Sequence, residues 1–355
     1  MAWTGPEPLT QDAARRGAER LDRLWRRGRA FLGTRYALMG GAMTWVSERT
    51  LVAAISEGGG FGVVACGAMK PERLSEEIRA TRARTSKPFG VNLIVMHPEL
   101  DGLIGACIAE KVSHVVLAGG LPSNAIVKKL KDSGAKVMTF LPAAVVAKKL
   151  IRAGIDAFVT EGAEAGGHIG AVSTSVLAQE ILPQVREVPV FVAGGIGRGE
   201  AIASYLEMGA AGCQLGTRFV CATESIAHPK FKHAFIRASA RDAMPSQQLD
   251  PRFPVIPVRA LVNKATERFL DTQRQVIDRF NRGEIARGEA QLAIEHFWAG
   301  ALRRAVVDGD VETGSLMAGQ SVGMVTCEQP VAEILEELVG QATLALAGRD
   351  QIGDA

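Results

Sequence analysis

The stretch Val190-Phe191-Val192-Ala193-Gly194-Gly195-Ile196-Gly197 is a short apolar run that ends in a cluster of glycines. A segment of helical period, Ala201–Met208, comes next, and a second apolar run, Gly212–Leu215, follows it. The second run ends in Gly216-Thr217-Arg218-Phe219. Apolar runs of four to six residues that alternate with helices are typical of parallel strands in β–α units. This stretch therefore predicts a β–α–β unit with glycine-rich turns after its strands.

The same unit recurs along most of the chain. Eight apolar runs follow one another at a spacing of about 21 to 33 residues: Tyr36–Met39, Gly62–Ala65, Gly90–Val95, His114–Leu117, Lys136–Phe140, Ala157–Thr160, Val190–Ala193 and Gly212–Leu215. Segments of helical period lie between them, among them Thr50–Gly58, Pro71–Arg84, Asn124–Ser133 and Val145–Ala153. Several end at a glycine, which favours the end of a helix. Eight units predict an α/β fold, a closed (β/α)₈ TIM barrel rather than an open sheet.

The flanking segments do not follow this pattern. Residues 1–34 form an N-terminal extension with one charged helix, Ala13–Arg29, which we expect to be mobile or loosely docked. A basic membrane-surface helix is the alternative, and the acidic residues Glu19 and Asp22 argue against it. Residues 223–307 lack apolar strand runs and predict a helical insertion that caps the barrel, with helices over Arg259–Asn281 and Ala286–Val307. The barrel then comprises residues 35–222 and 308–355, and its last helix spans Pro330–Ala347.

Composition excludes several classes of protein. Lys plus Arg number 41 against 38 Asp plus Glu, and aromatic residues are 5%, which argues against a nucleic-acid partner. No apolar run reaches the length of a membrane span, and the N-terminus lacks a signal peptide. Five scattered cysteines without a CxxC pair fit a reducing compartment, so we expect a cytoplasmic location. No histidine pair has metal-ligand spacing, and no metal is expected.

The loops after the last two strands predict a phosphate site. In TIM barrels these two loops commonly bind phosphate, and backbone N–H groups of Gly194-Gly195-Ile196 and Gly216-Thr217 can converge on one anion. Ordinary turns are the alternative, because a glycine pair alone is a weak signal. The two glycine loops fall at the expected strand positions, and this favours the phosphate.

His168 is the candidate catalytic residue. It lies in the longest glycine-rich loop, Gly162–Gly170, after the sixth strand. The flanking glycines offer no side chains against which His168 would pack as a core residue. An imidazole exchanges protons near neutral pH. Arg218 and Glu224, in contrast, are expected to be structural.

These motifs resemble the nitronate monooxygenase (2-nitropropane dioxygenase) family, which also contains the FMN-dependent enoyl-ACP reductase II enzymes. The resemblance runs from about Arg35 to Leu346. It is carried by Gly41-Ala42-Met43-Thr44-Trp45-Val46, Lys87-Pro88-Phe89-Gly90-Val91-Asn92, Glu161 to Gly170, Ala193-Gly194-Gly195-Ile196, Gly216-Thr217-Arg218-Phe219 and Ser315-Leu316-Met317-Ala318-Gly319-Gln320.

The resemblance implies an FMN cofactor, with His168 of the Gly-Gly-His motif beside it. It implies cofactor contacts at Gly41, Ala42, Met43, Asn92, Glu164, Gly167, Gly194, Gly195, Gly216 and Thr217, and a loop that folds over the flavin with Met317, Gly319 and Gln320. Family members often have Gln-Gly-Gly-Met where this chain has Gly40-Gly41-Ala42-Met43. That departure puts the contact at Ala42 in doubt.

Two reactions fit the resemblance. In the favoured one, the flavin oxidises an alkyl nitronate with O₂, and His168 binds the nitronate or takes the α-proton of a nitroalkane. In the other, NAD(P)H reduces FMN and an enoyl thioester on acyl carrier protein is reduced. A generic NAD(P)H:flavin or quinone reductase is a further alternative, as is a non-redox barrel that binds a phosphorylated metabolite. A small-molecule substrate is common to all of them, and a homodimer is left open.

Overall fold

A computed structural model describes residues 11–353, with side chains through Arg349. Residues 1–10, and the last two residues of the expected barrel, lie outside the described part. Eight parallel strands form one sheet in the order β1-β9-β8-β6-β5-β4-β3-β2. They are β1 (Leu38–Gly40), β2 (Gly62–Ala65), β3 (Phe89–Ile94), β4 (His114–Ala118), β5 (Lys136–Phe140), β6 (Ala157–Glu161), β8 (Val190–Ala193) and β9 (Gly212–Leu215).

Hydrogen bonds between β1 and the residue before β2 close the sheet on itself. Phe61 N donates to Leu38 O at 2.8 Å, and Gly40 N donates to Phe61 O at 2.9 Å. The TIM barrel is therefore confirmed, and all eight expected strands are present. The largest error is in the first strand, which was expected from Tyr36 and begins at Leu38.

Helices surround the barrel and follow the expected order. They are α3 (Arg49–Glu57), α4 (Pro71–Arg82), α5 (Leu100–Ala109), α6 (Asn124–Asp132), α7 (Ala147–Ala153) after the short helix η1 (Ala144–Val146), α8 (Thr174–Ile181), α9 (Gly199–Glu207) and α10 (Thr217–Val220). The Glu48 carboxylate caps α3 by accepting from Thr50 N and Leu51 N. Gly134, Gly154 and Gly209 follow three helices with φ between +86° and +106°, as their sequence positions predicted.

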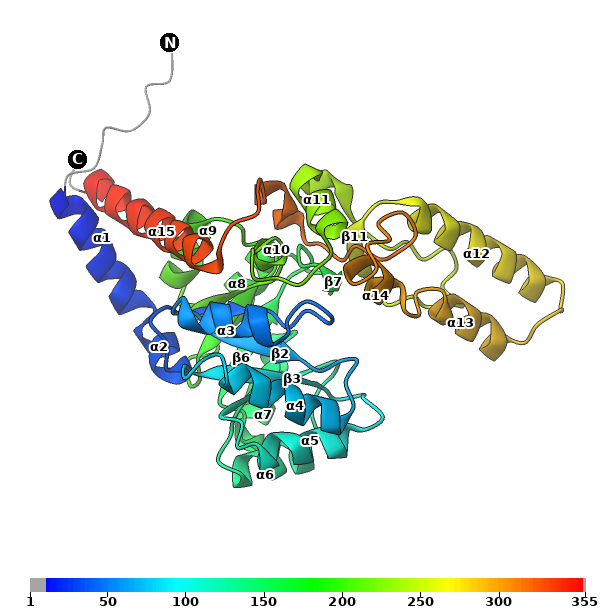
Figure 1. Cartoon of the computed structure of the whole chain (residues 1–355), viewed down its shortest axis with the longest axis horizontal. Helices are drawn as coiled ribbons and strands as arrows, with labels where there is room; N and C mark the ends of the chain where they lie inside the picture. The colour runs from blue at the N-terminus through cyan, green and yellow to red at the C-terminus, as the bar shows by residue number, and fades with distance from the viewer. Residues whose placement is uncertain (1–10, 354–355) are drawn as a thin grey trace, which may run out of the picture.

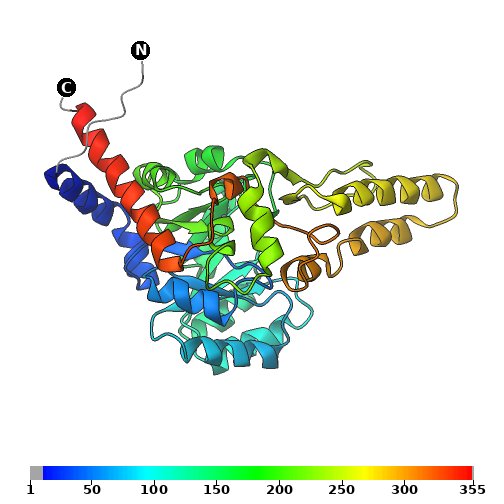
Figure 2. The same ribbon diagram turned by 45° about the horizontal axis from the view of Figure 1, so that its top comes forward.

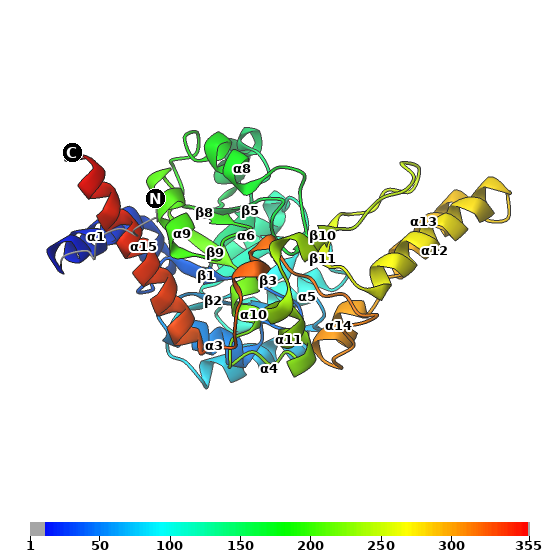
Figure 3. The same cartoon turned by 90° about the horizontal axis from the view of Figure 1, so that it is seen from above.

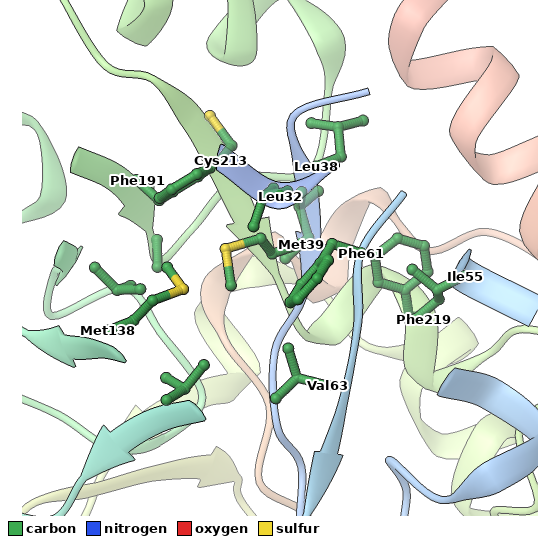
Figure 4. Packing of buried hydrophobic residues seen from close by; sticks show 14 of the residues in the cluster. Leu32, Leu38, Met39, Ile55, Phe61, Val63, Met138, Phe191, Cys213 and Phe219 are labelled. Atoms are coloured by element: carbon green, nitrogen blue, oxygen red, sulfur yellow. The ribbon is translucent and has the colours of Figure 1, made fainter. Parts of the chain in front are cut away.

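The register of the strands shows which side chains point into the barrel. Phe31 contacts His114 of β4 and Phe191 of β8, with ring centroids 5.4 and 6.3 Å apart. Because β4 and β8 are not neighbours in the sheet, a ring that contacts both lies inside the barrel. Val116, on the same face of β4 as His114, is in register with Met138 of β5. Met39, Val63, Met138 and Phe191 pack together there (Figure 4).

Phe31 closes the end of the barrel where the strands begin. It belongs to α2 (Arg26–Leu32), and its carbonyl oxygen lies 3.0 Å from His114 Nε2. We expect Phe31→Ala to lower the free energy of unfolding by about 2–4 kcal/mol, because it leaves a cavity among these rings. Denaturant unfolding measures this. Phe31→Leu should lose less than half as much, and an equal loss in the two variants would contradict the packing role.

The N-terminal segment docks firmly, which corrects the expectation of one loose helix. It forms α1 (Gln11–Leu24) and α2, broken at Trp25. Leu21 and Trp25 are each 2% exposed, and a side chain at Gly17 would lie 2.4 Å from Thr343 O. Thr343 belongs to the last helix, α15 (Val331–Gly353), which runs beside α1 (Figure 1). The small residue at position 17 therefore permits close helix packing.

The insertion, residues 223–307, contains strands as well as helices. It comprises α11 (Pro229–Arg237), η2 (Ala240–Asp242), β10 (Ala243–Pro245), β11 (Val258–Leu261), α12 (Lys264–Asn281), α13 (Arg287–His296) and α14 (Ala301–Val306), and η3 (Gln320–Met324) follows it. The helix expected from Arg259 was wrong at its start, since Arg259 lies in β11. The expected helix Ala286–Val307 is two helices, α13 and α14. The domain boundaries themselves stay a prediction.

The insertion reaches the barrel through a second, small sheet. Its strand order is β10-β11-β7, and β7 (Gly167–His168) belongs to the loop that follows β6. The α12–α13 hairpin has its own core, centred on Phe253, Phe269 and Ile294. It projects away from the barrel in all three views (Figures 1, 2 and 3). Within residues 11–353, no helix is long and apolar enough to span a bilayer.

Candidate active site

Three polar side chains form the top layer of the barrel interior, where the strands end. Asn92 is in register with Val116, and Gln214 is in register with the interior residue Met39. Glu161 is in register with Ala193, which is in register with Gln214. Residues that pair across neighbouring parallel strands share a face, so all three side chains point into the mouth of the barrel.

Glu161 is a carboxyl group without a partner in this layer. Within the described chain it forms no hydrogen bond or ion pair, whereas Asn92 Nδ2 donates to Val116 O at 3.1 Å. Burial raises the pKa of Glu161 to about 7, because a charged carboxylate is poorly solvated there. Sequence reasoning did not single out Glu161, which it placed in the loop after the sixth strand, or Gln214, which belongs to an apolar strand.

Glu161 makes the stability of the ligand-free protein depend on pH. Its folded pKa of about 7 exceeds the ordinary value of 4.5, so between these values the folded state binds more protons than the unfolded state. Stability then falls as pH rises through this range. We expect Glu161→Gln to be more stable than the wild type by about 1–3 kcal/mol at pH 8 and similar at pH 4.5, as measured by denaturant unfolding. If the difference in unfolding free energy between Glu161→Gln and the wild type were the same at every pH, this result would contradict the raised pKa of Glu161.

The two expected phosphate loops, Gly194–Gly197 and Gly216–Thr217, lie side by side because β8 and β9 are neighbours. Gly194 and Gly195 have φ of +98° and +70°, which glycine adopts without strain. Within residues 11–353, the N–H groups of Gly195, Ile196, Gly216 and Thr217 donate no hydrogen bond. Free N–H groups at two adjacent turns could hold an anion such as phosphate.

Glu164 packs directly against the first of these loops. A side chain at Gly195 would place its Cβ 2.8 Å from Glu164 Cβ. Thr174 N donates to Glu164 Oε2 at 2.8 Å, and the Thr174 hydroxyl lies within 3.0 Å of both Glu164 Oε2 and Gly194 O. Thr174 thus joins the His168 loop to the phosphate loop.

The C-terminal loop folds over the same place. Gln320 N donates to Glu164 O at 2.9 Å, and Gly319 N donates to the Thr217 hydroxyl at 3.0 Å. A side chain at Gly167 would lie 3.5 Å from Met317 Sδ. The structure therefore brings Met317, Gly319 and Gln320 to the loops after β6 and β9, and their contact with a flavin stays a prediction.

The loop after β1 lies next to the second phosphate loop. Gly41 N donates to Leu215 O at 2.8 Å, and a side chain at Gly216 would lie 3.5 Å from Met43 Sδ. Ala42 lies between Gly41 and Met43 in the same loop. The Ser47 hydroxyl fixes this turn by donating to Gly41 O and accepting from Met43 N, both at 2.9 Å.

His168 lies in strand β7 rather than in an irregular loop. It is in register with Val258 of β11, and Ile169 N donates to Pro257 O at 3.0 Å. The imidazole is exposed to solvent, yet the surrounding loops partly desolvate it and lower its pKa. Because the ordinary value is near 6.5, the ring is mostly neutral at pH 7 and is able to accept a proton.

Residues 27–104 and 100–341 match the family model of nitronate monooxygenase. This chain belongs to the nitronate monooxygenase family. It is therefore an oxidoreductase, in a family of flavoenzymes. The match covers the barrel strands and the His168 loop, and it confirms the resemblance seen in the motifs.

Individual members of this family differ in what they are named for. The chain is 36% identical to FabK from Thermotoga maritima, with a TM-score of 0.82 over 92% of this chain and 98% of that one. It is 25% identical to a nitroalkane oxidase from Streptomyces ansochromogenes, with a TM-score of 0.74 over 91% and 99%. It is 34% identical to a hydroxy-methyl-oxo-octahydroindene-carboxyl-CoA dehydrogenase from Rhodococcus jostii, over 62% of either chain. The match therefore spans less than two thirds of that enzyme's length.

Two other polar residues of this nitronate monooxygenase homologue, Arg218 and Glu224, are structural. Arg218 forms an ion pair with Glu337 at 2.5 Å, and Glu224 accepts from Val331 N at 3.0 Å, as the sequence predicted for both. The described residues contain no group of three His, Cys, Asp or Glu side chains arranged to hold a metal ion.

Proposed function

We propose that this chain is an FMN-dependent oxidoreductase of the nitronate monooxygenase type, which oxidises alkyl nitronates. The observation that carries the proposal is the pair of phosphate loops with free N–H groups, placed beside the Glu164 and His168 loop. A phosphate-bearing flavin fits this arrangement, because the loops supply donors for the phosphate. Asn92, Gln214 and Glu161 supply polar groups in the barrel mouth for the ring.

The proposed role of the protein is to position the reactants. The bound flavin supplies the redox chemistry, taking electrons from the nitronate and passing them to O₂. Gly195, Ile196, Gly216 and Thr217 would hold the cofactor phosphate through their N–H groups. Met317 and the following residues would cover the flavin and exclude water. Neutral His168 would bind the nitronate or take the α-proton of the parent nitroalkane at a ring nitrogen.

An enoyl thioester reductase is the second candidate. Two observations favour it: FabK, an enoyl-ACP reductase II, is more similar in sequence than the nitroalkane oxidase, and another relative is named for a carboxyl-CoA substrate. In addition, Val258 and Ala260 share a sheet face with His168, and Met244 is in register with Ala260. This apolar face suits a hydrocarbon chain. Here NAD(P)H would be the reductant and acyl carrier protein the partner.

Anaerobic reduction of the bound flavin separates the two candidates. We would mix the FMN-loaded protein with propyl nitronate, NADH or NADPH and follow the flavin absorbance. Bleaching by propyl nitronate supports the monooxygenase. Rapid bleaching by NADPH or NADH but not by nitronate would remove it in favour of the reductase. A cytoplasmic location and a homodimer are proposed with either activity, and light scattering during size-exclusion chromatography tests the dimer.

A further inference from the structure

Arg259 is a buried cation whose hydrogen-bonding capacity is only partly used. The side chain is 7% exposed, and it donates from Nε to Ala163 O at 2.9 Å and from Nη1 to Ala243 O at 2.5 Å. A guanidinium carries five N–H groups. Within residues 11–353 the remaining groups have no hydrogen-bond partner, and no carboxylate lies within ion-pair distance.

The other two buried Lys or Arg side chains among the described residues are paired with acids. Arg218 is 2% exposed and pairs with Glu337, and Lys232 is 6% exposed and pairs with Glu328. A buried charge without a paired acid is costly, and burial accordingly lowers the pKa of Arg259. Two carbonyl groups hold Arg259 in place, but a neutral amide could do the same. Glu164 acts on the charge of Arg259 but lies beyond ion-pair distance, so the guanidinium keeps N–H groups for a further anion.

The position of Arg259 indicates where its charge acts. Arg259 is in register with Gly167, one residue before His168, so its side chain lies on the opposite face of the small sheet from the imidazole. On that face it reaches Ala163, and the neighbouring Glu164 carboxylate is close enough to act on the pKa of Arg259. Glu164 in turn packs against Gly195 of the first phosphate loop. Arg259 is thus connected to the first phosphate loop through Ala163 and the adjoining Glu164.

The phosphate loops themselves lack such a charge. Gly194–Gly197 and Gly216–Thr217 contribute backbone N–H groups but no cationic side chain, and Glu164 places a carboxylate beside them. A phosphate brought next to a carboxylate is repelled unless a cation offsets the two negative charges. The guanidinium fork suits phosphate and planar two-oxygen anions, because two N–H groups bind two oxygens at once.

We propose that Arg259 binds an anionic oxygen of the ligand held in this site, and that the phosphate of the cofactor is the preferred source of that oxygen. This rests on the proposed function, since it assumes a ligand in the phosphate loops. The insertion then contributes directly to ligand binding: Arg259 links the loop after β6, strand β10 and the bound anion. An anionic substrate such as a nitronate is the other source of the same chemistry.

Arg259→Gln tests the proposal, with Arg252→Gln as the matched control. Arg252 also lies in the insertion, is exposed, and pairs with Asp250, so its loss changes the net charge equally. Flavin fluorescence gives the dissociation constants of FMN and of riboflavin, which lacks the phosphate. We expect Arg259→Gln to weaken FMN binding by about 10- to 100-fold and to leave riboflavin binding and the Arg252→Gln variant unchanged.

Each other result of these binding measurements either supports or overturns the proposal. Unchanged FMN binding with weakened binding of propyl nitronate to the anaerobic holoenzyme would support an anionic substrate as the source. Equal weakening of FMN and riboflavin, or no change in any ligand, would overturn the proposal. If Arg259→Gln does not fold, Arg259→Lys serves instead, because it keeps the charge and loses the fork. A several-fold loss for FMN alone supports the proposal, and no loss overturns it.

Inorganic phosphate separates this proposal from the proposed function. Stabilisation of the flavin-free wild type by phosphate, absent in Arg259→Gln, would support the anion site even if FMN did not bind. If the wild type and Arg259→Gln bind FMN with the same affinity, the anion site would be overturned and the proposed function would stand. A wild type that binds neither FMN nor phosphate would overturn both.

Discussion

Replacing His168 with alanine is expected to leave FMN bound and to lower turnover by about 10²- to 10⁴-fold, the usual contribution of a proton-transfer group. The imidazole is exposed, and His168 pairs with β11 only through its backbone. Removing the side chain therefore leaves no buried cavity. Steady-state kinetics with 1-nitropropane, which still carries the α-proton, with propyl nitronate, and with NAD(P)H plus an enoyl thioester measure the loss. FMN affinity, measured by fluorescence, should stay the same.

The pH dependence and a control variant sharpen this test. Partial desolvation lowers the pKa of His168, and a base works only when unprotonated, so the acidic limb of kcat/KM should lie below pH 6.5. That limb should disappear in His168→Ala. His296→Ala is the control, because His296 is exposed on α13 of the projecting hairpin. Full activity in His168→Ala would remove the histidine from the mechanism.

Gly195→Val is expected to weaken FMN binding by about 100-fold or more. Valine at φ of +70° is strained, and its Cβ would lie 2.8 Å from Glu164 Cβ. Either the phosphate loop or the Glu164 loop must then move, and the N–H groups of the phosphate loop no longer point toward one anion. Equilibrium titration with FMN measures the effect, and circular dichroism checks that the barrel still folds.

Gly134→Val is the matched control for the glycine prediction. Gly134 has φ of +86°, so valine there carries similar backbone strain, but the added Cβ meets nothing within 4 Å. Gly134 lies before β5, at the other end of the barrel from the phosphate loops. We expect lower stability in this variant with unchanged FMN affinity. Equal FMN affinity in Gly195→Val and the wild type would contradict the placement of the phosphate.

The barrel could be predicted from the sequence because each of its strands is buried on both faces. A run such as Val190–Ala193 is apolar throughout and ends at a glycine turn, so its bounds are visible without any partner strand. The phosphate loops and the His168 loop follow from the same reasoning, since loops after barrel strands share one end. Local patterns were therefore sufficient for these elements.

The small sheet could not be predicted, because it depends on contacts between distant residues. Strand β7 has two residues, and its partner Val258 lies in another part of the sequence. Arg259 was assigned to a helix because the helical period of α12 follows closely after it. Similarly, Glu161 and Gln214 are recognisable as site residues only when the closed barrel shows which strand faces point inward.

Identifying and counting the flavin in the purified protein tests most directly whether the phosphate loops and the His168 loop hold FMN. After incubation with FMN and removal of excess ligand, the protein should carry about one flavin per chain, with the visible absorbance of a bound flavin. Denaturation should release it as FMN rather than FAD or riboflavin. A protein that stays colourless under these conditions would contradict the account of the phosphate loops and of His168.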